Sequence, residues 1–200
     1  MPRTLPPAKL TLLECFRLFP RRRGLRYDAP MIGRPERTEA AAYYFTYIDR
    51  IASPDILGTL GAQSAEIVPW LRGIPEEKSR HRYAPGKWSI REMWNHVNDS
   101  ERVFLYRALW FARGFHEALP SFEQEIAVRH AGADEITWAQ HVEEFQSIRA
   151  ATLAFFRHLP AEAWKRTGVA SGNPVSVRAL AYIIAGHIAH HRAIIEERYL

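Results

Sequence analysis

Apolar side chains recur at helical spacing in four long stretches of the chain. The stretches cover roughly residues 54–73, 89–113, 136–158 and 176–198, and each sets an apolar face against a polar one. A shorter helix is expected before them, from the cap residue Thr38 through Ile51. Four long amphipathic helices bury their apolar faces best against one another, so the pattern predicts an all-α four-helix bundle with an additional short N-terminal helix.

Local signals mark where these helices begin and end. Ser89 and Glu92 have the spacing of a capping box, which predicts the start of the helix over 89–113. Ser53-Pro54-Asp55 predicts an earlier helix start with proline at its first position. Two connections are about 14 to 20 residues long, so consecutive helices need not be neighbours. We find no convincing alternating strand pattern, and Ser171-Gly172-Asn173-Pro174 predicts a loop.

The net charge of +5 is confined to the start of the 200-residue chain. Residues 1–30 contain seven Lys and Arg against two Asp and Glu, so 20 residues of each sign remain in 31–200. The neutral body argues against direct nucleic-acid binding, which depends on clustered basic charge. Residues 1–30 combine five prolines with this charge and predict a disordered tail, or a segment upstream of a true start at Met31. The domain is then 31–200.

Three further absences exclude several classes of protein. No apolar run reaches about 18 residues, so we expect no membrane span. The apolar stretch Leu10 to Phe19 precedes its arginine cluster, which is the wrong order for a signal peptide. A single cysteine, Cys15, excludes a disulfide framework and a cysteine-based zinc site. These features favour a cytoplasmic protein.

Histidines interrupt the apolar stripe of the last helix and are the candidate chemistry. His187 and His191 are four residues apart, so both rings can reach one point beside the helix. His96 lies near the start of the helix over 89–113 and offers a third imidazole. Three neutral imidazoles with an open position are typical of a catalytic metal site, whereas structural zinc takes four protein ligands.

Two alternatives remain open at this point. Each histidine could instead be a core residue hydrogen-bonded to a carbonyl or to Asp99. His190 follows His187 by three residues, so a pair of His187 and His190 is also compatible with the spacing, although it fits the apolar stripe less well.

Three segments of the sequence resemble the DinB superfamily. They are Tyr83–Arg102 with its continuation Tyr106–Arg113, the C-terminal Gly186–Ile195, and Met31–Glu39, which resembles the opening of one bacterial branch. The resemblance implies an up-down-down-up four-helix bundle. It also implies that three histidines bind a divalent metal, zinc or nickel, and these carry over to His96, His187 and His191.

The resemblance implies chemistry as well as fold. Similar proteins include thiol S-transferases and isomerases that use bacillithiol or mycothiol. We therefore expect the metal to activate a thiol or water for S-transfer or hydrolysis, with a small thiol or electrophile as partner and a homodimer as an open possibility. Around the metal, the sequence offers Glu92, Asp99 and His190 as supporting groups, and Tyr83 and Trp88 as pocket walls.

Each of these assignments has a plainer counterpart. Glu92 and Asp99 also fit solvated helix positions, and the two aromatic residues also fit the core. The competing function is a non-catalytic bundle that uses the metal for stability and serves as a stress-related interaction protein. Binding to DNA, which the family name suggests, would be confined to the basic tail.

Overall fold

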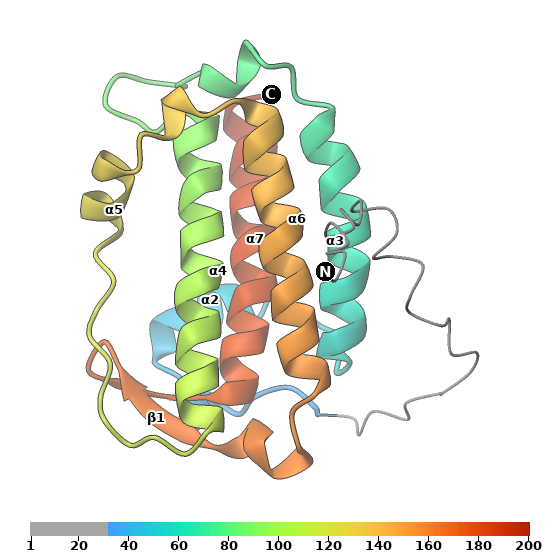
Figure 1. The fold of residues 1–200 in the computed structure, drawn as a ribbon, viewed down its shortest axis with the longest axis vertical. Coiled ribbons are helices and arrows are strands. Elements are labelled where there is room, and N and C mark those ends of the chain that lie inside the picture. The colour runs from blue at the N-terminus through green and yellow to red at the C-terminus, as the bar shows by residue number, and fades with distance from the viewer. Residues whose placement is uncertain (1–31) are drawn as a thin grey trace, which may run out of the picture.

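The computed structural model describes residues 32–200, and a four-helix bundle accounts for most of them (Figure 1). Helices α4 and α3 lie diagonally across the bundle, and each packs against both α6 and α7. Along the chain the helices run up, down, down and up, as the family resemblance implied (Figure 1). The bundle helices are α3 (Ile56–Arg72), α4 (Ile90–Ala112), α6 (Trp138–Arg157) and α7 (Val177–Arg198).

The long connections determine which helices are neighbours. The segment between α4 and α6 runs the length of the bundle and contains the short helix α5 (Gln124–His130), so α4 and α6 lie side by side and parallel (Figure 1). The connection from α3 to α4 crosses one end of the bundle, and that from α6 to α7 crosses the other. This topology brings α4 and α7 together as antiparallel neighbours.

Side-chain caps fix the first turn of each long helix. The predicted capping box is present, since Ser89 Oγ accepts from the backbone N–H of Glu92 and Glu92 accepts from that of Ser89. Helix α3 begins at Ile56 with Asp55 as its cap, so Pro54 precedes the helix instead of occupying its first position. Thr137 and Ser176 cap α6 and α7.

The expected helix over 38–51 is only partly formed. The chain there makes two 3₁₀ turns, Arg37–Glu39 and Ala42–Tyr44, and a single α-helical turn, α2 (Phe45–Ile48). Its apolar side chains pack across α7 instead of continuing along a helix axis. Helix propensity therefore gives way here to packing against the bundle.

The segment over 167–176 corrects the expectation of no strands. Strands β1 (Thr167–Ala170) and β2 (Asn173–Ser176) pair antiparallel across a tight turn at Ser171-Gly172. Both turn residues have positive φ, 52° and 73°, which suits a two-residue hairpin. The strands are too short for an alternating pattern to stand out in the sequence. The residues Ser171-Gly172-Asn173-Pro174, which predicted a loop, contain the turn of this hairpin.

Two apolar clusters fill the interior. One cluster lies toward the hairpin and includes Phe104 and Ile184, and the other lies toward the opposite end and includes Val97 and Ile188. Buried polar side chains lie where one cluster gives way to the other, namely Glu101 of α4, Arg149 of α6 and His187 of α7, and the buried His96 and His191 lie beside the second cluster.

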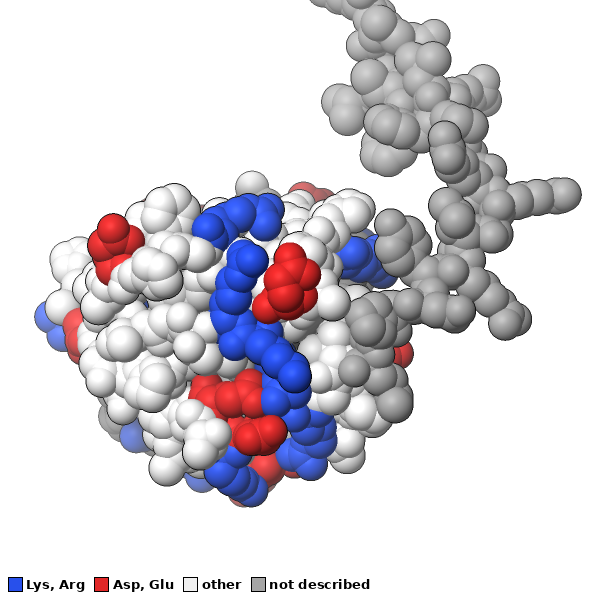
Figure 2. Space-filling model, turned by 90° about the horizontal axis from the view of Figure 1, so that it is seen from below, with Lys and Arg blue, Asp and Glu red and all other residues white. Residues whose placement is uncertain are grey.

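The surface carries both signs of charge. Figure 2 views the hairpin end of the bundle, where a band of Lys and Arg side chains is flanked by Asp and Glu. Within residues 32–200, none of the helices combines the length and apolar character needed to cross a bilayer. The predicted tail over 1–30, with Cys15 and the candidate start at Met31, lies outside the described residues.

Candidate metal centre

The three predicted histidines meet inside the bundle. Nε2 of His187 lies 3.1 Å from Nε2 of His96 and 3.0 Å from Nε2 of His191. The side chains are between 4% and 8% exposed, and one ring nitrogen from each lies within 4.8 Å of the others. His96 comes from α4 and the other two from successive turns of α7, so the antiparallel contact of these helices creates the cluster.

Burial keeps the three rings neutral. It lowers the pKa of His96 to about 4, and the nearby His190 contributes to this shift. Burial also lowers the pKa of His187 and of His191 well below the usual range, with the neighbouring imidazoles adding to the effect. Each ring therefore keeps a nitrogen lone pair near pH 7, which is the form that binds a metal.

A serine orients the histidine of α4. Ser100 Oγ lies 3.4 Å from Nδ1 of His96, one helical turn away. In the tautomer that donates from Nδ1 to this hydroxyl, the lone pair of Nε2 faces the other two rings. Nδ1 of His191 is buried and has no hydrogen-bond partner among the described residues.

The cluster fits a divalent metal better than it fits three core histidines. Imidazole ligands at about 2.0–2.1 Å from a zinc ion lie roughly 2.9 to 3.4 Å apart, which matches the two Nε2 distances. His141 shows the core alternative, because its Nε2–H donates to one fixed partner, the Ala133 carbonyl, at 2.9 Å. Within residues 32–200, no fourth His, Cys, Asp or Glu joins the group. The donor set is that of an open site.

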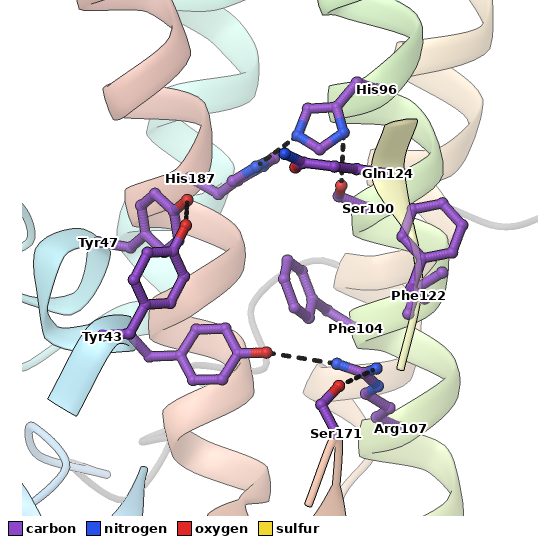
Figure 3. A pocket seen from close by; sticks show the side chains of 12 residues that line it. Tyr43, Tyr47, His96, Ser100, Phe104, Arg107, Phe122, Gln124, Ser171 and His187 are labelled. Carbon is purple, nitrogen blue, oxygen red and sulfur yellow. Dashed lines mark hydrogen bonds between the residues drawn. The ribbon is translucent and has the colours of Figure 1, made fainter. Parts of the chain in front are cut away.

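A cavity of about 140 Å³ opens on one side of the histidines (Figure 3). The ring of Tyr47 lies edge-on to His187 at 5.2 Å, and the hydroxyls of Tyr43 and Tyr47 are 2.6 Å apart. Burial and this hydrogen bond raise the pKa of Tyr47, so its phenol stays protonated. Phe104 forms another wall, with Arg107 farther along the same helix.

A second cavity, of about 350 Å³, reaches His191 from another side. Both predicted wall residues, Tyr83 and Trp88, line it. The Trp88 ring packs against His96 at 5.1 Å, while Tyr83 packs edge-on to Tyr199 at 4.9 Å. The histidine cluster therefore lies between two cavities.

The three predicted supporting residues lie in different surroundings. The carboxylate of Glu92 accepts from the Ser89 backbone and from Arg82, and that of Asp99 accepts from Asn95 and Arg102. Neither forms a hydrogen bond with a histidine in the described structure. His190 is partly buried and packs against His191 at 5.1 Å, and its buried Nδ1 has no hydrogen-bond partner among residues 32–200.

Sequence reasoning identified His96 and His187 but assigned no role to the other residues of the first cavity. Ser100, Phe104 and Arg107 follow His96 at intervals of four, four and three, which places them on the same face of α4, so this stripe was a usable signal. No comparable signal marks Tyr43 and Tyr47, because their segment reaches the site only through the fold.

Comparisons with known proteins place this site in a family. A model of the DinB superfamily matches residues 59–195, a range that includes all three histidines. Among solved structures, the chain is similar to YfiT from Bacillus subtilis, described as a probable metal-dependent hydrolase with an unusual four-helix bundle topology. The TM-score is 0.59 at 16% sequence identity, covering 82% of this chain and 89% of that one. No match is found among curated proteins.

Proposed function

The chain belongs to the DinB superfamily, and from this premise we propose that it is a metal-dependent enzyme. His96, His187 and His191 hold a divalent cation, zinc or nickel, for the activation of a thiol or water in S-transfer or hydrolysis. The partner is a small thiol or electrophile in the cytoplasm. One observation carries the proposal, namely that three buried neutral imidazoles converge beside a cavity with no fourth protein ligand among residues 32–200.

The residues around the cluster suit this activity. When bound, a cation on three neutral ligands lowers the pKa of a thiol or water molecule. Ser100 holds the His96 ring, and the aromatic rings of Trp88 and Phe104 limit access of bulk water. The phenol of Tyr47 beside His187 stays protonated, so it can donate a hydrogen bond to a bound substrate.

Both hydrolysis, with water as the nucleophile, and S-transfer, with a thiol, have support. YfiT, which shares the fold, is called a probable hydrolase, and this favours water as the nucleophile. The resemblance to thiol S-transferases favours a thiol. The two cavities that meet at the histidines give room for two reactants, as transfer requires.

Metal analysis tests the site. Purified full-length protein should contain about one divalent ion per chain, and His187→Ala or His191→Ala should lose it, because two imidazoles do not complete the ligand set. His190→Ala is the matched control and should retain the ion, because its ring lies beside the cluster and is not one of the three whose nitrogens converge. Full occupancy in both alanine variants at unchanged fold would overturn the proposal.

A spectroscopic experiment separates an enzyme from a metal-stabilised bundle. With cobalt(II) in the site, an added small thiol should produce a sulfur-to-metal charge-transfer band whose pH midpoint lies well below the free thiol pKa of about 8.5. His96→Ala should lose the band because its ligand set is incomplete. A cobalt spectrum that neither thiol nor azide changes would indicate a closed site and replace the enzyme with the structural alternative.

A further inference from the structure

Arg107 lies at the end of the first cavity away from the histidines (Figure 3). Its side chain is buried, with 4% of the residue exposed. His96 and Arg107 are three helical turns apart on one face of α4, a separation of about 16 Å between their Cα atoms. Helical side chains lean toward the N-terminus, so the guanidinium extends back along the cavity toward His96.

Arg107 differs from the other buried arginines of the described chain. Arg91 pairs with Glu76, and Arg149 pairs with Glu101. No carboxylate within residues 32–200 lies within 4.0 Å of the Arg107 guanidinium. A buried charge without a counter-charge destabilises the folded protein, so an anionic ligand that pairs with this guanidinium would be bound favourably.

The partners of Arg107 fix its position but are all neutral. Its Nη2 donates to the Pro120 carbonyl and to Ser171 Oγ, both at 3.0 Å. Nη1 has only a long contact of 3.5 Å with the Tyr44 hydroxyl, and Nε has no hydrogen bond in the described structure. Of the five N–H donors of the side chain, two are thus engaged at normal distance, and the others remain for a ligand.

The surrounding fold is built to hold this group. The hairpin turn supplies Ser171, and the strand-like contact of Leu119 with Val169 and Ser171 brings Pro120 beside it. Gly168 lies against Phe111 so closely that a Cβ there would be 2.0 Å from the ring. The hairpin, which sequence analysis did not find, therefore places the acceptors that orient Arg107.

We propose that Arg107 binds the carboxylate of a small-molecule substrate whose reacting group lies at the histidine cluster. The inference rests on the proposed function and names its substrate class. A carboxylate matches the planar fork of a guanidinium and supplies the missing negative charge. Among residues 32–200, Arg107 is the one formally charged residue that lines this cavity, and aromatic walls such as Tyr44, Phe104 and Phe122 suit a short apolar stem. A phosphate dianion carries a second negative charge that a single arginine does not balance.

Binding measurements on the full-length, metal-loaded protein test the assignment. Mercaptohexanoate and mercaptohexanol differ only in the terminal carboxylate, and their dissociation constants can be compared by calorimetry. The acid should bind about tenfold more tightly to the wild type, as expected for a charge-assisted contact. In Arg107→Gln this preference should vanish while the affinity for the alcohol stays the same. Equal wild-type affinities, a preserved preference in the variant, or stronger binding of inorganic phosphate would each overturn the assignment.

Two controls keep the result interpretable. Arg102→Gln removes an exposed arginine from the same helix and should leave the preference unchanged. Arg107→Lys keeps the buried charge without the planar fork, so its preference should fall below that of the wild type, and an unchanged preference would contradict the role of the fork.

A metal-free comparison separates this inference from the proposed function. Hexanoate and hexanol, which carry no thiol, should show the same Arg107-dependent preference in His187→Ala, where the metal is lost. If metal content and cobalt spectra contradict the enzyme while this preference persists, only the proposed function fails. If the metal site is confirmed and the preference is absent, only the role of Arg107 fails.

Discussion

Histidine occurs in two chemical settings within this one bundle. His141 is fully buried, and its ring meets the Ala133 carbonyl at 2.9 Å, as a core histidine should. At the cluster, Nε2 of His187 instead faces the Nε2 atoms of two other imidazoles. Neutral rings that face one another in this way share donors and acceptors poorly, and a cation between them resolves the mismatch.

The contact between Ser100 and His96 gives a prediction at this scale. Ser100→Ala should weaken metal binding by about tenfold without changing the number of ions bound, because the His96 ring loses its orienting partner. A competition titration with a chromophoric chelator measures this. Ser147→Ala, which removes an exposed hydroxyl on α6, should leave the affinity unchanged. Equal affinities in wild type and Ser100→Ala would show that the hydroxyl does not orient the ring.

Single residues differ in how far the sequence reveals their role. His187 and His191 stand out because they interrupt an apolar stripe at helical spacing, and His96 was the third candidate from its place near the start of the helix over 89–113. Arg107 lies on the same face of α4 as His96, but an arginine in a helix gives no sign that it is buried. Tyr47 reaches His187 from a segment more than a hundred residues away along the chain, so only the fold shows the contact.

At the scale of elements, the close contact of α2 with α7 positions one wall of the site. A Cβ on Gly186 would lie 2.1 Å from the Tyr47 carbonyl oxygen, so only glycine allows this approach. Because Tyr47 packs on His187, the next residue of α7, the contact also fixes the cavity. The sequence shows a glycine in a helix but does not show which backbone approaches it.

Gly186→Ala should therefore destabilise the protein although alanine favours helices. The expected loss is about 1–3 kcal/mol in the free energy of unfolding, since α2 must move away from α7. Gly61→Ala on α3 is the matched control, because its nearest atom is 3.9 Å away, and it should be neutral or stabilising by up to about 1 kcal/mol. Urea unfolding measures both, and a stabilised Gly186→Ala would contradict the close contact.

Glu39 ties the N-terminal segment to the start of α7. Burial raises the pKa of its carboxyl, but hydrogen bonds from Arg178 and Ser176 outweigh this and lower the pKa below its usual 4.5. A carboxyl with a lowered pKa stabilises the fold above its unfolded-state pKa, and this contribution is lost as pH falls through the lowered value.

Replacing this carboxyl should have a pH-dependent effect. Glu39→Gln should lower the free energy of unfolding by about 1–2 kcal/mol at neutral pH. The difference from the wild type should shrink as pH falls through the lowered pKa of Glu39, which chemical denaturation at several pH values would follow. Glu162→Gln, in an exposed pair, should have almost no effect at any pH. A difference that stays constant with pH would show that charge is not involved.

Elements were predictable where local chemistry decides them. The Ser89 cap and the four long apolar periods gave the bundle helices nearly at their observed bounds. The helix expected over 38–51 forms only in part and the hairpin over 167–176 was not predicted, because packing against α7 and α4 determines their conformation. The parallel contact of α4 with α6 could not be predicted either. The helical period of the apolar residues identifies the buried face of a helix but not the helix that packs against it.

Across the whole molecule, one polar network connects all four bundle helices. Arg149 of α6 forms a two-point ion pair with Glu101 of α4, at 2.9 and 2.8 Å, with both side chains buried. Its Nη1 also donates to Gln63 of α3 at 3.1 Å, and Gln63 donates to the Ala185 carbonyl of α7 at 2.9 Å. The network lies where the two apolar clusters meet, as His187 does, and fixes the register of the helices that carry the histidines.

The loss in the free energy of unfolding when this network is broken should depend on whether an unpaired charge stays buried. Arg149→Met leaves the Glu101 carboxylate without its partner and should lower the free energy of unfolding by about 3–5 kcal/mol. Adding Glu101→Met removes the stranded charge, so the double variant should be more stable than Arg149→Met alone. Urea unfolding of the metal-free proteins measures both values. Arg102→Met, which breaks exposed pairs, should cost less than about 1 kcal/mol. If the two buried substitutions instead add, the pair is not coupled, and the register of α4 and α6 must come from apolar packing alone.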